Sequence, residues 1–198
     1  MKKYVAILSM GLLAVSCASN QVIQSTVERA DDVSSRPDWA SLTKPIYEEN
    51  GKKYFLGFVE VDSESSKSAA LNMSDEKAIS EPFRSIVDQF LDQNQVGEEL
   101  KGSTGQRIIS STRSSRPAIT DLQIVKRYWE LVEPKPINGP VRSSLRVYSL
   151  AEVSTAELER AKQRYLSSLS SNLNVKKVLD EVGALQREKA LNQKNQGE

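Results

Sequence analysis

Histidine is absent from this chain of 198 residues, and cysteine occurs once, at position 17. Histidine is the commonest general base near neutral pH and a common zinc ligand, so its absence excludes the usual sites built on either role. A single cysteine excludes an internal disulfide, a cysteine-rich metal centre and a Cys–His catalytic pair. Carboxylates, lysine and serine remain as catalytic side chains. We therefore expect a protein that is not an enzyme and that needs no cofactor or metal.

The chain also lacks a second long apolar run beyond its N-terminus, so the sequence predicts no transmembrane helix of about 20 residues. Neither sign of charge dominates, because 27 lysines and arginines stand against 26 aspartates and glutamates. Without residues 1–16, which hold two of the lysines, the balance is 25 against 26, or −1. Such a chain has no overall field that attracts nucleic acid, and we expect no nucleic-acid partner.

The sequence does contain an export signal in residues 1–16. Two lysines precede an apolar run from Tyr4 to Val15. That run is too short to span a bilayer and is typical of the core of a signal peptide. We therefore predict that this segment is removed on export.

The apolar run ends in Leu13-Ala14-Val15-Ser16-Cys17, which resembles the lipobox of bacterial lipoproteins, in which the cysteine thiol accepts diacylglycerol. Ala14 stands where that pattern prefers leucine, and Ala14-x-Ser16 also fits an ordinary secretory cleavage site. An ordinary site would leave one free thiol in an oxidising compartment. We therefore predict lipid on Cys17, with the membrane as its partner. By resemblance to enterobacterial sorting, Ala18 after the cysteine favours the periplasmic face of the outer membrane.

The mature chain begins with a polar segment. Residues 17–36 combine the lipidated N-terminus with a stretch without sustained periodicity, which predicts a flexible tether. An α/β domain is expected over residues 37–153. Trp39 follows Pro37 at its start, and we interpret this tryptophan as an anchor on the core rather than as a ligand-stacking side chain.

The first half of the domain predicts a strand and then a helix. Residues 53–61 are aromatic and β-branched after a turn-like Glu49-Asn50-Gly51, and Gly57 within them indicates the close approach of a helix or a bulge. Apolar residues between 69 and 91 then recur at helical spacing. Ser80-Glu81-Pro82 interrupts them, so the segment is either two helices or one kinked helix.

The second half predicts a hairpin. Residues 93–117 form a loop or a weak helix, and strands are expected over 119–132 and 141–153. Pro134, Pro136 and Asn138-Gly139-Pro140 should form the turn between them, because proline does not fit the interior of a strand.

Helices are expected at the C-terminus, over residues 154–192. Ser154-Thr155-x-Glu157 resembles a capping box, and residues 172–174 should separate two helices before a disordered tail over 193–198. The predicted order is β-α-β-β-α-α. The fold class is α+β, in two layers, with a small, mostly antiparallel sheet, one helix packed across it and C-terminal helices.

The order of these features resembles the LPP-twenty family of small outer-membrane lipoproteins, which includes the flagellar lipoprotein P group. Apart from the lipobox cysteine, the matching features cover about residues 36 to 150. They are the lipobox cysteine Cys17, Pro37-x-Trp39, Tyr54-x-x-Gly57, the helix alanines Ala69, Ala70 and Ala78, Tyr128-Trp129 and Leu145-x-Val147-Tyr148. The long polar segment 93–117 and the two C-terminal helices depart from the family pattern. The resemblance implies a domain without enzymatic activity on the outer membrane, in some members assembled into rings around the flagellar motor.

Candidate catalytic groups are few. Asp75-Glu76 and Glu98-Glu99 are paired acids, but neighbouring residues on a helix point in different directions, and solvated faces explain them better. Gly102-x-x-Gly105 lacks the Lys-Ser/Thr of a phosphate-binding loop. We therefore assign no catalytic, cofactor-binding or metal-binding residue.

Charge is distributed unevenly along the domain. Residues 51–100 hold 5 basic and 10 acidic side chains, and residues 101–150 hold 9 and 3. The two halves either pair within the molecule or meet head to tail between copies, as in rings and filaments. A structural lipoprotein that associates with itself or with envelope partners is the leading hypothesis. The alternative is a module that binds peptidoglycan or another periplasmic ligand through basic residues of the sheet region. These are Arg107, Arg113, Arg116, Arg127, Arg142 and Arg146.

Overall fold

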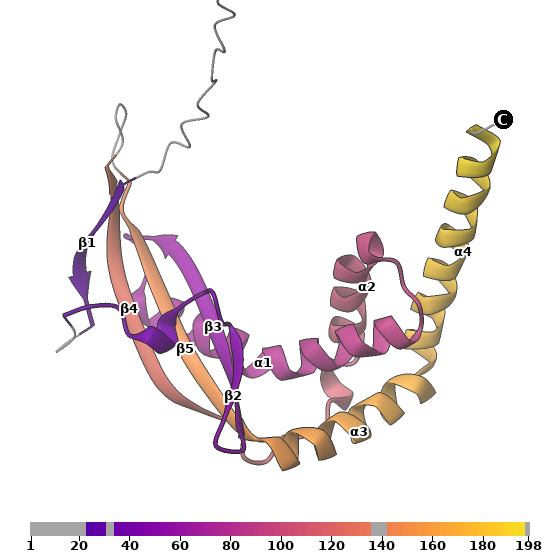
Figure 1. Ribbon diagram of the computed structural model, residues 1–198, viewed down its shortest axis with the longest axis horizontal. Helices are drawn as coiled ribbons and strands as arrows, with labels where there is room; N and C mark the ends of the chain where they lie inside the picture. Colours follow the sequence, from indigo (N-terminus) through magenta and orange to yellow (C-terminus); the bar gives the residue numbers. More distant parts are fainter. Residues whose placement is uncertain (1–22, 31–33, 136–141, 197–198) are drawn as a thin grey trace, which may run out of the picture.

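The computed structural model describes residues 23–30, 34–135 and 142–196. Within these ranges the chain forms a five-stranded antiparallel sheet, in the order β1-β4-β5-β3-β2, and four α-helices (Figure 1). The predicted α+β fold with a small antiparallel sheet is confirmed.

Three long strands form the middle of the sheet: β3 (Lys52–Asp62), β4 (Gln123–Lys135) and β5 (Ser144–Ser154). β3 pairs with β5 over its full length, and β4 and β5 form the predicted hairpin. Along β5, Val147 packs toward helix α1 and the neighbouring Tyr148 packs on the opposite face. Because successive side chains of a strand alternate between faces, a strand that is apolar on both sides needs cover on both.

One face is covered by α1 (Lys67–Gln93), a single helix of 27 residues. Ser66 caps its first turn by accepting a hydrogen bond from the backbone N–H of Ala69. Pro82 lies inside the helix and is buried. Of the two alternatives left by the sequence, the continuous helix is therefore the one formed.

The predicted close approach at Gly57 is confirmed. A Cβ atom added to Gly57 would lie 2.0 Å from the backbone oxygen of Ser74 and 2.6 Å from the backbone nitrogen of Ala78. The hydroxyl of Ser74, which is fully buried, donates to the carbonyl oxygen of Gly57 at 3.0 Å. Only glycine lets the backbones of β3 and α1 come this close.

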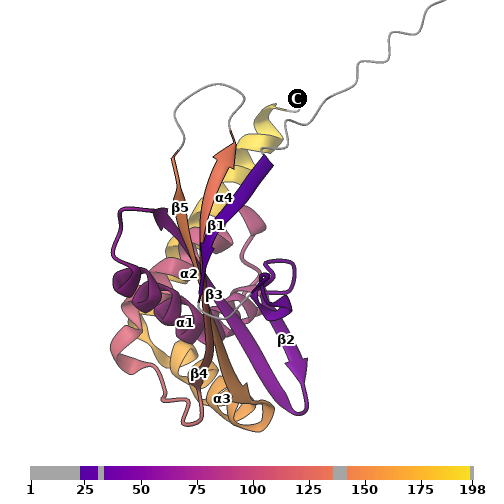
Figure 2. The same cartoon turned by 90° about the vertical axis from the view of Figure 1, so that its left-hand side faces the viewer.

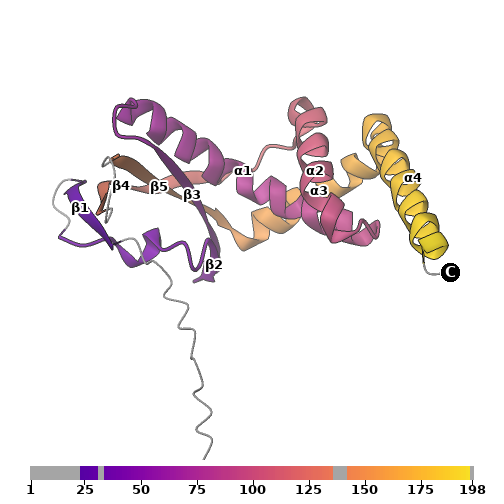
Figure 3. The same ribbon diagram turned by 90° about the horizontal axis from the view of Figure 1, so that it is seen from above.

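Beyond the sheet, α1 continues into a helical layer with α2 (Glu98–Ser111), α3 (Thr155–Ser171) and α4 (Leu173–Gln196) (Figures 1 and 3). The segment expected as a loop or weak helix is thus largely helix α2. Ile108 of α2 is fully buried, and the hydroxyl groups of Thr112 and Tyr165 lie 2.7 Å apart, joining the end of α2 to α3.

The C-terminal helices begin and end at the expected residues, with one correction. Asn172 ends α3, and its side-chain oxygen accepts hydrogen bonds from the first turn of α4. The disordered tail predicted for residues 193–198 is wrong for its first part, because α4 continues through Gln196. Glutamine and lysine are good helix formers, so a polar end does not stop the helix.

The tether predicted for residues 17–36 is also wrong in part. Ile23–Arg29 form β1, an edge strand that pairs antiparallel with β4, with a register shift between Thr26 and Glu28. Thr26, Glu28 and Arg29 of β1 are exposed or only half-buried, so this edge strand has no buried face that would require an apolar alternation. Residues 17–22 and 31–33 lie outside the described ranges.

The segment between β1 and β3 crosses the face of the sheet opposite α1 (Figures 2 and 3). It contains the short 3-10 helix η1 (Asp38–Ala40) and the strand β2 (Ile46–Glu49), which the sequence analysis missed. Trp39 packs on this face with the fully buried Ala40, as expected for an anchor. Asn50 and Gly51, with φ of 52° and 72°, make the predicted turn into β3.

Pro134 corrects a third prediction. It lies within β4 rather than in the turn, and pairs in register with Gln24 of β1. Beyond Val132, which pairs with Ser144, β4 has a ladder only with β1 among the described residues, and proline is tolerated at such an edge. Pro136 and residues 138–140, assigned to the same turn, lie outside the described ranges.

Candidate functional site

The predicted lipid attachment site, Cys17, lies outside the described residues, and its modification stays a prediction. The described chain begins at Ile23, six residues later, already paired with Lys135 of β4. A membrane anchor at Cys17 would therefore be connected to the edge of the sheet through only residues 18–22.

A buried carboxylate holds the segment that follows β1. Glu130 of β4 is only 1% exposed, and on the face opposite α1 it forms an ion pair with Arg36. The hydroxyl of Tyr128 donates to the second carboxylate oxygen of Glu130 at 3.0 Å. The guanidinium of Arg36 also lies over the ring of Tyr148, 5.4 Å from its centroid. This cluster fixes the N-terminal segment to the centre of the sheet.

The electrostatics of this cluster are those of a structural site. Burial raises the pKa of Tyr148 to about 12, and burial together with the hydrogen bond to Glu130 raises the pKa of Tyr128. Both phenols therefore stay neutral at physiological pH. Burial tends to lower the pKa of Arg36, but the bond to Glu130 outweighs it and raises that pKa. Neither phenol is therefore poised to exchange a proton near pH 7.

A second polar cluster joins α1 to the sheet on the other face. Asp75 accepts hydrogen bonds from Arg127 at 3.0 and 2.7 Å and from the hydroxyl of Ser149 at 2.6 Å. Its neighbour Glu76 instead pairs with Arg113 at 3.3 Å. The two acids thus point in different directions, as predicted. Ser149 donates to a carboxylate that Arg127 already neutralises, so nothing in this cluster activates its hydroxyl as a nucleophile.

We expect the Asp75 cluster to stabilise the fold in a pH-dependent way. Burial acts to raise the pKa of Asp75, but the hydrogen bonds from Arg127 and Ser149 lower it below 3.8. A lowered pKa contributes stability above the unfolded value, which is lost as pH falls through the folded value. Asp75→Asn should therefore lower the free energy of unfolding by about 1–2 kcal/mol at pH 7.

This difference between Asp75→Asn and the wild type should shrink as the pH falls below 3.8, measured by urea unfolding across pH. Glu76→Gln is the matched control, because its ion pair is more than 70% exposed on both sides. It should cost less than about 0.5 kcal/mol. A pH-independent loss in Asp75→Asn would contradict the assignment.

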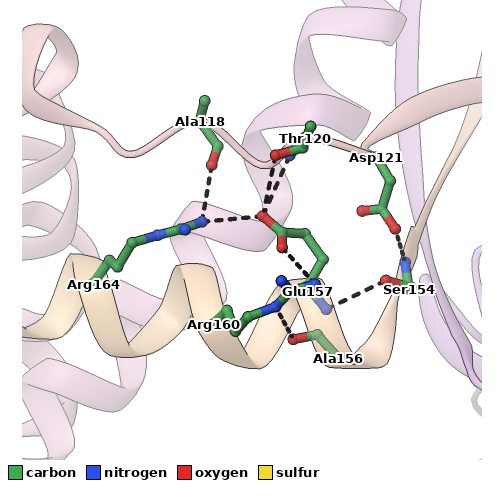
Figure 4. Close-up of polar contacts among 8 residues, drawn as sticks. All are labelled: Ala118, Thr120, Asp121, Ser154, Ala156, Glu157, Arg160 and Arg164. Carbon is green, nitrogen blue, oxygen red and sulfur yellow. Dashed lines mark hydrogen bonds and ion pairs between the residues drawn. The ribbon is translucent and has the colours of Figure 1, made fainter.

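A third cluster surrounds Glu157 at the start of α3 (Figure 4). Its carboxylate accepts a hydrogen bond from Arg164 at 3.0 Å and pairs with Arg160 at 3.0 Å. It also accepts weaker bonds from the backbone and hydroxyl of Thr120. Burial acts to raise the pKa of Glu157, but the bonds from Arg164 and Thr120 lower it.

The predicted capping box is formed only in half. The hydroxyl of Ser154 accepts a hydrogen bond from the backbone N–H of Glu157. The backbone N–H of Ser154 donates not to Glu157 but to the carboxylate of Asp121, at 3.2 Å (Figure 4). Glu157 is held by the preceding loop and two arginines instead, so it joins that loop to α3.

The described residues also form a groove, which we call the α1–α2 groove, between these helices and the part of β3 beyond its ladder with β2, where Leu56 and Phe58 line it. Its main cavity has a volume of about 530 Å³. Lys77, Glu81, Arg84 and Asp88 of α1 line it, opposite Gly102 of α2. Burial raises the pKa of Glu81 and of Asp88, and Arg84 offsets part of this effect in both. Gly102-x-x-Gly105 therefore lies in a helix beside this groove, and not in a phosphate-binding loop.

A smaller cavity of about 400 Å³ continues the groove past Lys77. The exposed apolar side chains of Met73 and Ile79 line it together with Arg113 and Arg116. The groove thus combines apolar walls with charges of both signs, which suits binding of a mixed polar and apolar ligand better than catalysis.

The six arginines singled out from the sequence do not form one patch. Arg107, Arg113 and Arg116 lie on or just after α2, whereas Arg127 and Arg146 lie on the sheet. Four of them pair with carboxylates of this chain, which are Glu181, Glu76, Asp75 and Glu60. Much of the uneven charge along the sequence is therefore paired within the molecule.

The described residues contain no group of three or more histidine, cysteine, aspartate or glutamate side chains placed to hold a metal ion. Over the same part of the chain, every helix is too short or too polar to cross a bilayer.

The Arg36–Glu130 pair was not predicted from the sequence. Its only signal was an acid between two apolar pairs in the strand, Tyr128-Trp129-Glu130-Leu131-Val132.

Compared with known proteins, the chain matches no family model, no curated protein and no solved structure.

Proposed function

We propose that this chain is an outer-membrane lipoprotein with a structural role in the cell envelope. Signal peptidase removes residues 1–16, lipid on Cys17 holds the protein at the periplasmic face, and the α+β domain contacts copies of itself or envelope partners. The lipobox sequence ending at Cys17 supports the anchor. The order of motifs shared with the LPP-twenty family supports the structural role.

One observation carries this proposal: from Ile23, six residues after Cys17, the chain is built into the domain. β1 pairs with β4 from Ile23 to Arg29, and Arg36 then joins the segment to the buried Glu130. Ladder hydrogen bonds between antiparallel strands are perpendicular to the strands. A force that pulls along β1 therefore acts on all the hydrogen bonds between β1 and β4 at the same time. A domain attached in this way resists being pulled away from its anchor, as a structural lipoprotein must.

The assembly part of the proposal concerns the partners. Head-to-tail contacts between unlike faces close into rings or extend into filaments. In the resembling family, some members assemble in this way around the flagellar motor, and we extend the same role to this chain. Chemical cross-linking of the lipidated protein in membranes should give oligomers. A strictly monomeric protein at native abundance would contradict self-association.

Mass spectrometry of the mature protein tests the anchor itself. We expect an N-terminal peptide that begins at Cys17 and carries diacylglycerol on sulfur. An N-terminus at Cys17 with a free thiol would indicate ordinary secretion and would contradict the proposal.

A second candidate is a binding module for peptidoglycan or another envelope ligand, favoured by the α1–α2 groove. Arg113 is 77% exposed and therefore accessible to an anionic polymer, and the half-buried Arg116 lines the smaller cavity beside it. If the groove binds peptidoglycan, Arg113→Ala/Arg116→Ala should reduce retention on purified sacculi several-fold at low salt, as measured by co-sedimentation. Arg160→Ala, an exposed arginine outside the groove, is the control. Equal retention of both variants would contradict this candidate.

A further inference from the structure

The membrane anchor would enter the molecule at one identifiable end. β1 starts opposite Lys135, at the end of the sheet where β4 leads toward β5. Six residue steps separate Cys17 from Ile23, and a chain spans at most about 3.6 Å per residue. The start of β1 therefore lies within about 22 Å of the lipid attachment point.

The free end of α4 points to this same end of the molecule. In Figure 1 the sheet and α4 stand as two arms joined by the other helices, and the start of β1 and the C-terminal end of α4 both lie at the top. Figure 2, turned about the vertical axis, shows the same placement. The start of α4, where Leu173 is 79% exposed, is the other end of this helix and lies beside the end of α3, farther from the top (Figure 1).

The last ion pair of α4 among the described side chains is made by Lys189. Val175, Val178 and Val182 are buried in the helical core, and Lys189 makes an exposed ion pair of 3.5 Å with Glu99 of α2. Beyond Lys189 the helix continues to Gln196, with Leu191 63% exposed. Residues 185–196 hold three basic residues and one acidic residue. An exposed leucine among basic residues suits the surface of a bilayer that contains anionic lipid.

We propose that the free end of α4 is a second contact with the membrane to which Cys17 is anchored. The inference rests on the proposed lipidation of Cys17. Two contacts fix the tilt of the domain, which one acylated residue followed by a few residues of chain does not. The β2–β3 turn at Asn50-Gly51 then faces away from the membrane, because β5 separates the two ends of the sheet by about 33 Å.

The single cysteine makes this arrangement directly testable. Lipid would block Cys17 in the mature protein. The Leu191→Cys variant and the Leu173→Cys variant therefore each carry a single free thiol, at the substituted position. Both positions are exposed leucines of the same helix. Each lipidated variant, labelled with bimane, is reconstituted in vesicles of phosphatidylethanolamine and phosphatidylglycerol that carry a quencher on the lipid headgroup.

We expect headgroup quenching of the label at position 191 to be several-fold stronger than at position 173. Equal, weak quenching at both positions on protein that floats with the vesicles would overturn the second contact and leave the anchor intact. Protein that does not float with the vesicles would instead count against the lipid anchor, and with it this inference. If the label at position 191 is shielded from solvent to the same extent with and without vesicles, another copy of the chain covers it. This result would also overturn the proposal.

Discussion

Replacing Gly57 by alanine is expected to lower the free energy of unfolding of the domain by about 3 kcal/mol. The added methyl group would lie 2.0 Å from the carbonyl oxygen of Ser74, a backbone atom of α1 that no side-chain rotation can remove. Relief requires α1 to move off the sheet, which opens the buried contacts of Ser74 and Ala78. Urea unfolding followed by tryptophan fluorescence should show a lower midpoint at an unchanged slope.

Gly102→Ala is the matched control for this prediction. Gly102 lies in the middle of α2, and a Cβ atom added there would have no other atom within 4 Å. Alanine there should leave the packing unchanged and raise stability by about 0.5–1 kcal/mol through helix propensity. The same substitution is thus expected to act in opposite directions at two glycines. A loss of less than about 0.5 kcal/mol for Gly57→Ala would contradict the described packing of α1 on β3.

Removing Arg36 is expected to have the second largest effect on the fold. Arg36→Ala leaves Glu130, which is 1% exposed, without its cationic partner on the face opposite α1. A buried charge without its partner is strongly destabilising, but Arg36 itself is 39% exposed and water partly compensates. We therefore expect a loss of about 2 kcal/mol in the free energy of unfolding.

The double variant Arg36→Ala/Glu130→Gln separates the ion pair from general packing. If the charge of Glu130 causes the loss, the double variant should be more stable than Arg36→Ala alone. Hydrogen exchange should also rise over residues 34–45 in Arg36→Ala, because the pair holds this segment on the sheet. Exposed Arg142→Ala should change stability by less than about 0.5 kcal/mol. A double variant no more stable than the single one would contradict the assignment.

Elements with a strong local signal could be predicted from the sequence. Gly57 within an apolar, aromatic strand indicated the approach of α1. The cap at Ser154 and the break at Asn172 depend on side chains that bond the nearest backbone groups. Such contacts lie within three residues of each other, so sequence spacing determines them.

Elements that depend on distant partners could not be predicted in this way. β1 has no strong apolar pattern, and its pairing with β4 joins residues about 100 positions apart. α2 contains two glycines, yet packing of Ile108 against the core favours the helix over its weak propensity. The Arg36–Glu130 pair joins residues 94 positions apart, and the acid between apolar pairs at Glu130 does not indicate which cation it meets.

The positions of β1 and α4 determine how an anchor at Cys17 would hold the domain. β1 and the Arg36–Glu130 pair join the N-terminal segment to the sheet, and α4 extends toward the same end of the molecule. A lipid at Cys17 would hold a domain whose orientation is limited by a short connection. The attachment to the membrane depends on the one cysteine of the chain, Cys17.

Fractionation of Cys17→Ser against the wild type, in cells that export both, tests this account most directly. The account predicts wild-type protein in the salt-washed outer-membrane fraction and processed Cys17→Ser protein in the soluble periplasmic fraction, with cleavage verified by mass. Ala18→Ser, which keeps the thiol and the lipobox, should remain with the membrane. Processed Cys17→Ser protein that sediments with the outer membrane as the wild type does would contradict the account.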